Sequence, residues 1–153
     1  MWGGETALGI DCSGLVRGAL QDAELREGMR ARNPALFRAA ISLWWHDCSA
    51  KALGENYRGL TATIAVAKSM NEADYTRLRP GDIAVLSSGV HTMAYLGDKT
   101  WIQADPLPMR VVRTVVPSEE GWFTQEVRFL RWTQFDVVKE VASARLPTSP
   151  RRL

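Results

Sequence analysis

Apolar positions recur at helical spacing in the first half of the chain and form short runs in the second half. From residue 15 to residue 23 they make one stripe, which predicts a buried face on a helix that begins near Ser13. Asn33 followed by Pro34 is typical of a helix start, and this second helix is expected to end at about Trp45 or His46. The segments after these helix signals are expected to form a polar turn at 26–33, a loop at 54–59 and a further helix at 60–70.

Short β-type segments fill the second half of the chain. They lie at 83–86, 91–96, 100–103, 110–116 and 125–132. A turn is expected at Pro80-Gly81-Asp82 and a hairpin loop at residues 97–99. Helices followed by a run of antiparallel strands are the α+β pattern, so we expect N-terminal helices packed on a small antiparallel β-sheet.

The length and charge limit the classes to which the protein can belong. A chain of 153 residues suits one domain, expected at 1–142 with a loose tail at 143–153. The formal net charge is only +2 and the basic residues are dispersed, so no nucleic-acid partner is expected. No run approaches the ~18 apolar residues of a membrane helix. The first residues lack the order of a secretory signal, which leaves the localisation open.

The segment Asp11-Cys12-Ser13-Gly14 carries the chemistry that the sequence indicates most clearly. Asp11 or Ser13 can cap the helix start, which places Cys12 in the first turn. Unpaired amide groups there favour a thiolate and can stabilise an oxyanion. A cysteine nucleophile also needs an imidazole, and His91 at the start of a strand is the better of the two histidines.

The strand register predicts which side chain orients the imidazole. With a three-residue loop at 97–99, Met93 faces Gln103, and His91 and Gln103 become diagonal neighbours on one sheet face. With a two-residue loop the parity changes and Gln103 points away. Asp105, which faces His91 in the register of the three-residue loop, is the alternative orienting residue.

Simpler interpretations stay open for each of these residues. Cys12 can be an ordinary buried thiol or can pair with Cys48, while His91 and Gln103 can be plain sheet residues. A rival cluster at residues 44–49 places His, Asp and Cys side by side, but consecutive helical residues point in different directions. That cluster fits a helix end with two aromatic anchors, or a wall of a substrate cleft that includes Trp45. The cysteine and histidine spacings match no zinc pattern, so no metal is expected.

Three motifs, taken in order, resemble the NlpC/P60 family of papain-like cysteine peptidases. The first is Trp-Gly-Gly at 2–4 followed by Gly-Ile-Asp-Cys-Ser-Gly-Leu-Val at 9–16. The second is Leu-Arg-Pro-Gly-Asp-Ile at 78–83. The third is His91, then Leu-Gly at 96–97, then Gln103 on the next strand. The resemblance covers roughly residues 2–16 and 78–105.

This resemblance implies a single-domain thiol peptidase that cuts peptidoglycan stem peptides, often between D-glutamate and the following diamino acid. It implies Cys12 as nucleophile, His91 as general base and Gln103 as the orienting residue, with no cofactor. Asp11 and Ser13 match positions that help to hold a substrate amino group, and Trp2 and Trp45 are the aromatic residues expected beside the substrate. Such an enzyme acts at the cell wall, whether secreted, periplasmic or phage-delivered. It is expected to be a monomer, with an inhibitor or immunity protein as partner if it is a toxin.

The chain also departs from the family pattern. Gln103 stands where histidine is common, and residues 92–94 are Thr-Met-Ala where the family commonly has Val-Gly-Ile. A tyrosine often found two residues before Trp-Gly-Gly falls before the first residue of this chain. The region 22–75 is longer than usual and is expected to be a helical, partly inserted segment. An acyltransferase or transglutaminase-type enzyme, or an inactive binding module of the same fold, are therefore the alternative functions.

Overall fold

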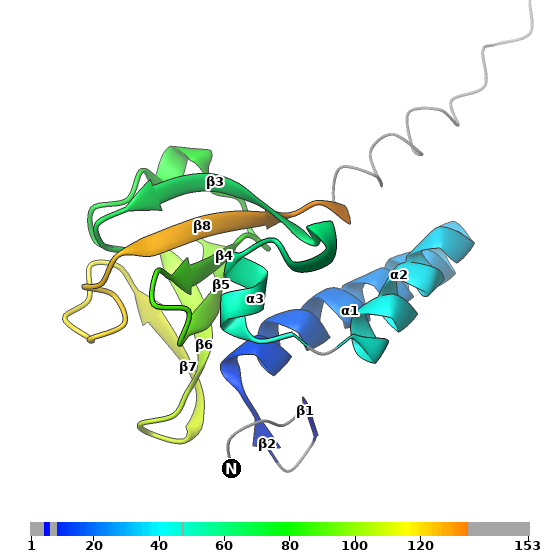
Figure 1. Cartoon of the computed structure of the whole chain (residues 1–153), viewed down its shortest axis with the longest axis horizontal. Helices are drawn as coiled ribbons and strands as arrows, with labels where there is room; N and C mark the ends of the chain where they lie inside the picture. Colours follow the sequence, from blue (N-terminus) through cyan, green and yellow to red (C-terminus); the bar gives the residue numbers. More distant parts are fainter. Residues whose placement is uncertain (1–4, 7–8, 47, 135–153) are drawn as a thin grey trace, which may run out of the picture.

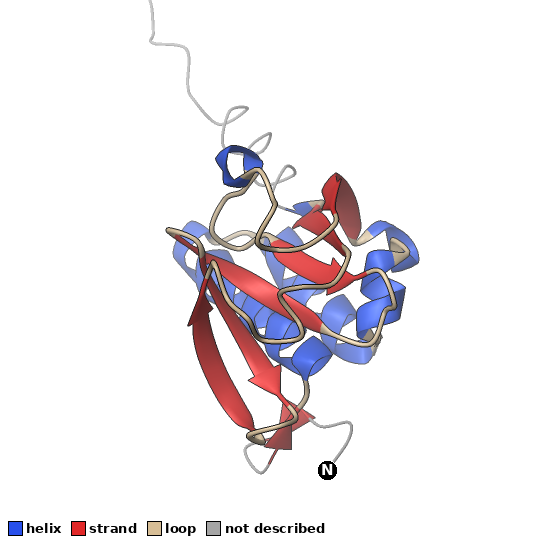
Figure 2. Ribbon diagram, turned by 90° about the vertical axis from the view of Figure 1, so that its left-hand side faces the viewer, coloured by secondary structure: helices blue, strands red, loops and turns tan. Residues whose placement is uncertain are grey.

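The structure is a computed structural model, and it describes residues 5–6, 9–46 and 48–134. The expected boundary at residue 142, the tail at 143–153 and Trp2 lie outside these residues. The elements in chain order are β1 (Glu5–Thr6), β2 (Gly9–Ile10), α1 (Cys12–Ala31), α2 (Pro34–Trp45), α3 (Ala50–Gly54), η1 (Tyr57–Gly59), β3 (Thr61–Ala67), η2 (Tyr75–Arg77), β4 (Ile83–Leu86), β5 (Thr92–Gly97), β6 (Thr100–Asp105), β7 (Arg110–Val115) and β8 (Val127–Trp132). Helices lie on one side and the sheet on the other (Figures 1 and 2).

The main sheet has six strands in the order β3-β8-β4-β5-β6-β7, and every neighbouring pair is antiparallel. Its central strand β4 is buried on both faces, so the strand reads as an unbroken apolar run. Ile83 and Val85 pack with the α1 residues Val16 and Leu20. The alternate residues of the strand, Ala84 and Leu86, point to the other face and enter a second cluster around Trp101. This arrangement confirms the expected α+β fold.

The helix α1 is longer than the sequence indicated, because the expected turn at 26–33 is mostly its last turns. Polar residues there lie on the solvent side, where Arg26 pairs with Asp22 and Arg30 with Glu27. On the opposite side Gly28 lets α2 approach closely, since a Cβ atom built on Gly28 would lie 3.3 Å from the Cβ of Leu36. The last helical residue is Ala31, and the C-cap residue Arg32 adopts the left-handed conformation.

The prediction of a helix at 60–70 is wrong. Residues 61–67 form β3, which pairs with β8 at the edge of the main sheet. The buried Thr61 hydroxyl donates to the carbonyl of Leu53, and the β-branched residues of this segment suit a strand better than a helix. The region 22–75 is therefore only partly helical: it holds the rest of α1, then α2, α3, two short 3-10 turns and one strand.

The hairpin between β5 and β6 is also different from the expected one, with a consequence for the register. Its loop has two residues, Asp98 and Lys99, both with positive φ, and Gly97 pairs with Thr100. The register then shifts at Leu96, and Tyr95 pairs with Trp101. The extra residue restores the parity, so that continuing the register places Met93 opposite Gln103. The expected loop was wrong, but the expected side-chain parity is present.

Burial of a carboxyl group in α1 gives a prediction about stability. Glu24 is 4% exposed, neither of its oxygens has a hydrogen-bond partner, and burial raises its pKa from 4.5 to about 7. Between these pH values the folded state keeps a proton that the unfolded chain has lost, so the contribution of Glu24 to the free energy of unfolding should fall by about 3 kcal/mol as the pH rises from 4.5 to above 7. It should then stay level above pH 7.

Urea unfolding of Glu24→Leu at pH 5 and pH 8 checks this expectation. The variant should be more stable than the parent at pH 8. Its free energy of unfolding should also change much less between pH 5 and pH 8 than that of the parent. Glu27→Gln is the matched control, because Glu27 lies on the same helix but is ion-paired at the surface. An unchanged pH dependence in Glu24→Leu would contradict the assignment.

Candidate active site

The start of α1 holds Cys12 in a fixed place. Asp11 is the N-cap residue, and its Oδ1 accepts from the backbone N–H of Gly14 at 2.6 Å and from the Ser13 hydroxyl at 2.9 Å. Cys12 is the first helical residue and is partly buried. The glycine-rich approach to this point forms the two-stranded pair of β1 and β2.

The packing of α1 brings the thiol to the sheet. α1 contacts β5 and β6, and the backbone of Thr92 lies close enough to the Cys12 thiol to lower its pKa. Thr92 is the first residue of β5 and directly follows His91. The structure therefore brings the sulfur to the start of the strand that the sequence indicated, although Cys12 and His91 lie 79 positions apart in the chain.

His91 and Gln103 are joined by a short hydrogen bond. His91 Nε2 lies 2.6 Å from Gln103 Oε1, and both side chains are buried, with exposed fractions of 2% and 0%. The amide oxygen can only accept, so Nε2 carries the hydrogen and Nδ1 is the ring nitrogen left for a proton from elsewhere. Asp105, the alternative orienting residue, instead accepts from the backbone N–H of Leu107 and from Trp122 Nε1.

Two residues beside this pair were not predicted as site residues from the sequence. The ring of Trp122 stacks on His91 with centroids 4.5 Å apart and planes 22° apart. Glu120 accepts from Gln103 Nε2 at 3.3 Å. Both come from the segment between β7 and β8, where no periodicity marks them; the only signal is an isolated tryptophan in a polar loop.

Burial dominates the protonation of the two reactive groups. It raises the pKa of the Cys12 thiol, and the nearby charge of Asp11 adds to this rise, against the lowering effect of the Thr92, Ser13 and Cys12 N–H groups. Burial also lowers the pKa of His91, against the raising effects of Gln103 and Asp105. The amide groups at the helix start lower the pKa of the thiol, as expected from the sequence, but burial outweighs them. Both net shifts favour the neutral form of the group concerned.

Alkylation of Cys12 by iodoacetamide should therefore be slow at pH 6 and should accelerate with a midpoint above that of a free cysteine. Rates measured against pH in the Cys48→Ala variant report Cys12 alone, because the chain has two cysteines. A small free thiol alkylated under the same conditions is the reference. Fast alkylation of Cys12 at pH 6 would instead show a thiolate stabilised by an imidazolium.

The remaining residues of interest lie apart from this pair or outside the described part. Trp45 is 75% exposed at the end of α2 and packs edge-on against Trp44. Cys48 is buried and forms no disulfide with Cys12, so the alternative pairing of the two cysteines is absent. Ser13 is buried and donates to Asp11. Within the described residues, no group of three or more His, Cys, Asp and Glu side chains could hold a metal ion.

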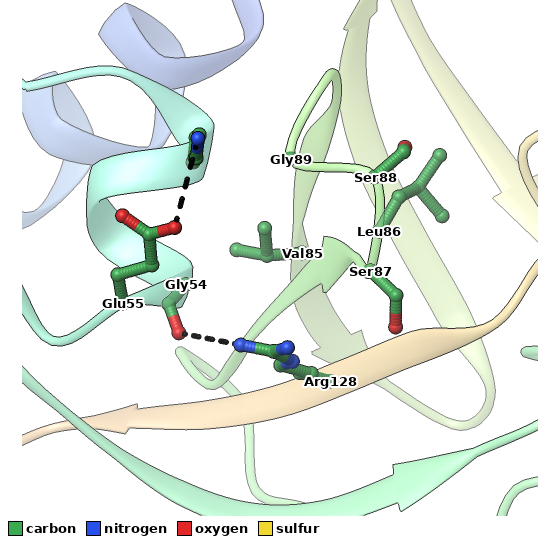
Figure 3. Close-up of a pocket in the computed structure, with 9 residues that line it drawn as sticks. Gly54, Glu55, Val85, Leu86, Ser87, Ser88, Gly89 and Arg128 are labelled. Atoms are coloured by element: carbon green, nitrogen blue, oxygen red, sulfur yellow. Dashed lines mark hydrogen bonds and ion pairs between the residues drawn. The ribbon is translucent and has the colours of Figure 1, made fainter.

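A separate shallow pocket lies between α3, the β4–β5 turn and β8 (Figure 3). Lys51 and Glu55 form an ion pair at its α3 side, and Arg128 donates to the carbonyl of Gly54. Neither Cys12 nor His91 lines this pocket. It is therefore not the hollow in which the thiol would meet a ligand.

The family of the chain follows from comparison with known proteins. Among the described helices, none is long and apolar enough to cross a bilayer. No curated protein matches the sequence. The family model for the NlpC/P60 family matches residues 1–131, which include the helix start with Cys12, the Pro80-Gly81-Asp82 turn and the His91–Gln103 pair. The chain belongs to the NlpC/P60 family, whose members are generally cysteine peptidases.

Proposed function

We propose that this protein is a cysteine endopeptidase that hydrolyses peptide bonds in peptidoglycan stem peptides, of the type that cuts between D-glutamate and a diamino acid. The observation that carries the proposal is the hydrogen bond from His91 Nε2 to Gln103 Oε1, because it leaves Nδ1 as the base. The position of Cys12 beside the backbone of Thr92, the residue that follows His91, supports it. The family of the chain supports the substrate class.

The chemistry starts from a neutral pair. As the substrate carbonyl approaches, Nδ1 of His91 takes the thiol proton and the sulfur attacks the carbonyl carbon. Amide N–H groups at the start of α1 stabilise the oxyanion. The imidazolium returns its proton to the leaving amine, and water then releases the acid from the acyl-enzyme.

Stacking by Trp122 keeps water away from the bond between His91 and Gln103, and its ring face stabilises the imidazolium while that cation exists. The half-buried Asp11 carboxylate at the helix start suits the free amino group of a stem peptide, with Ser13 orienting that carboxylate. Trp2 and Trp45 are proposed as aromatic contacts further along the substrate.

Digestion of defined stem-peptide fragments, followed by mass spectrometry of the products, tests this function. The expected result is one new carboxyl end and one new amine end at the D-glutamyl bond. Addition of a second amine separates hydrolysis from acyl transfer, because a transferase would give an amide product in place of the acid. Intact substrate after prolonged incubation would favour an inactive module of the same fold.

A further inference from the structure

The orientation of the Gln103 amide has a visible cause. This side chain is fully buried and bonds at both ends: Oε1 to His91 and Nε2 to Glu120 Oε2. An ionised carboxylate accepts hydrogen bonds but cannot donate them. The amide end that faces Glu120 must therefore be the NH2 group, which leaves the oxygen to face His91.

This orientation decides which nitrogen of His91 carries the proton. A carbonyl oxygen opposite Nε2 requires Nε2–H and leaves a lone pair on Nδ1. If the amide were turned by 180°, its NH2 group would face Nε2 and would favour the tautomer with Nδ1–H. A ring in that state cannot take the proton of the Cys12 thiol.

We propose that Glu120 is a positioning residue that selects the reactive tautomer of His91 through the Gln103 amide. The proposal rests on the proposed function for its catalytic consequence, since it takes His91 as the base. Its physical core, which is the link between a carboxylate and the ring tautomer, is independent of any substrate.

The surroundings of Glu120 hold the carboxylate in place for this role. Its two oxygens also accept from the hydroxyl of Thr114 at 3.2 and 3.3 Å. Its backbone N–H donates to Ser118 Oγ, and its carbonyl accepts from the N–H of Phe123, a fully buried residue that anchors the loop. The same loop carries Trp122 against the imidazole. The Glu120 residue itself is exposed, so its replacement removes no part of the core.

The charge of Glu120 adds to this effect of orientation. Gln103 is a neutral amide where a charged or ionisable residue would stabilise an imidazolium more strongly. A carboxylate bound to its NH2 group polarises the amide and makes Oε1 a better acceptor. The network from Glu120 through Gln103 to His91 thereby supplies part of the negative charge that Gln103 lacks.

Nitrogen NMR of the His91 ring tests the proposal in the purified protein above pH 7. In the parent we expect Nε2 protonated and Nδ1 unprotonated. Glu120→Ala should shift part of the population to the Nδ1–H tautomer, whereas Glu120→Gln, which still offers an acceptor to the Gln103 NH2 group, should retain most of the original tautomer. Glu119→Gln is the matched control, an exposed neighbour with no place in the network.

Activity gives a second readout. Glu120→Ala should lower kcat/KM by about 10- to 100-fold, a fraction of the ~10²–10⁴ that a general base contributes. In a Gln103→Ala background the same substitution should have little further effect, because the link is already cut. Ring nitrogens that are unchanged in Glu120→Ala, or activity losses that simply multiply, would overturn the proposal. A parent without peptidase activity would refute the proposed function and leave the NMR test of the link intact.

Discussion

Replacement of Cys12 by alanine is expected to abolish the hydrolysis of peptidoglycan stem peptides. In the proposed mechanism the change removes the sulfur that forms the acyl-enzyme. Loss of the nucleophile in a catalytic triad costs at least about 10⁴-fold in kcat. The measurement is product formation by mass spectrometry at equal protein concentration.

Cys48→Ala is the control for this experiment, because it removes the other thiol of the chain from a buried position in the core beside α3. It should keep the activity of the parent as long as the protein is folded, which circular dichroism verifies. Cys12→Ser retains the shape of the side chain but has a hydroxyl that is much harder to deprotonate, so it should also be inactive. Turnover by Cys12→Ala near the parental rate would rule out the mechanism.

The second large effect is expected at Asp82, which the Pro80-Gly81-Asp82 motif brings to the start of β4. Its carboxylate is fully buried and accepts from Arg131 Nε at 2.8 Å, from Arg131 Nη2 at 2.7 Å and from the Arg79 N–H at 2.7 Å. Asp82→Ala removes the carboxylate from the mostly buried Arg131 guanidinium and from the Arg79 N–H group. Breaking such a pair costs about 3–5 kcal/mol in the free energy of unfolding.

Urea unfolding followed by circular dichroism measures this loss. Asp82→Asn keeps an acceptor for the Arg79 N–H but loses the charge, so it should fall between the parent and the alanine variant. Asp74→Ala is the matched control, an exposed aspartate that caps η2 through the N–H of Thr76 and should cost only about 1 kcal/mol. A loss below about 1 kcal/mol in Asp82→Ala would mean that the pair contributes little to stability.

The sequence predicted those elements whose signals are local. The Asn33–Pro34 helix start and the apolar run of β4 lie where expected, because a cap and a fully buried strand are determined by adjacent residues. The strand β3 was missed because its identity depends on pairing with β8, some 65 positions further along the chain. Propensity cannot reveal such a partner.

The residues of the candidate site show the same contrast between local signals and contacts that only the fold creates. Cys12 and His91 carry motifs that can be read in sequence, and so does Gln103 through the register of one hairpin. Trp122 and Glu120 belong to a loop without periodicity, and only the folded chain shows that Trp122 stacks on the imidazole and that Glu120 contacts Gln103. The net shift in the pKa of the thiol could not be predicted either, because the helix start is visible in the sequence but the burial that outweighs its amide groups is not.

Leu96, the residue at which the β5–β6 register shifts, limits how the sequence of this hairpin can vary. Its side chain is 42% exposed, so its chemical identity is weakly constrained, yet its presence determines the face on which Gln103 emerges. Insertion or deletion of one residue between His91 and Gln103 would turn one of the two to the far side of the sheet. Descendants of this gene should therefore substitute freely at this position but vary the hairpin only in steps of two.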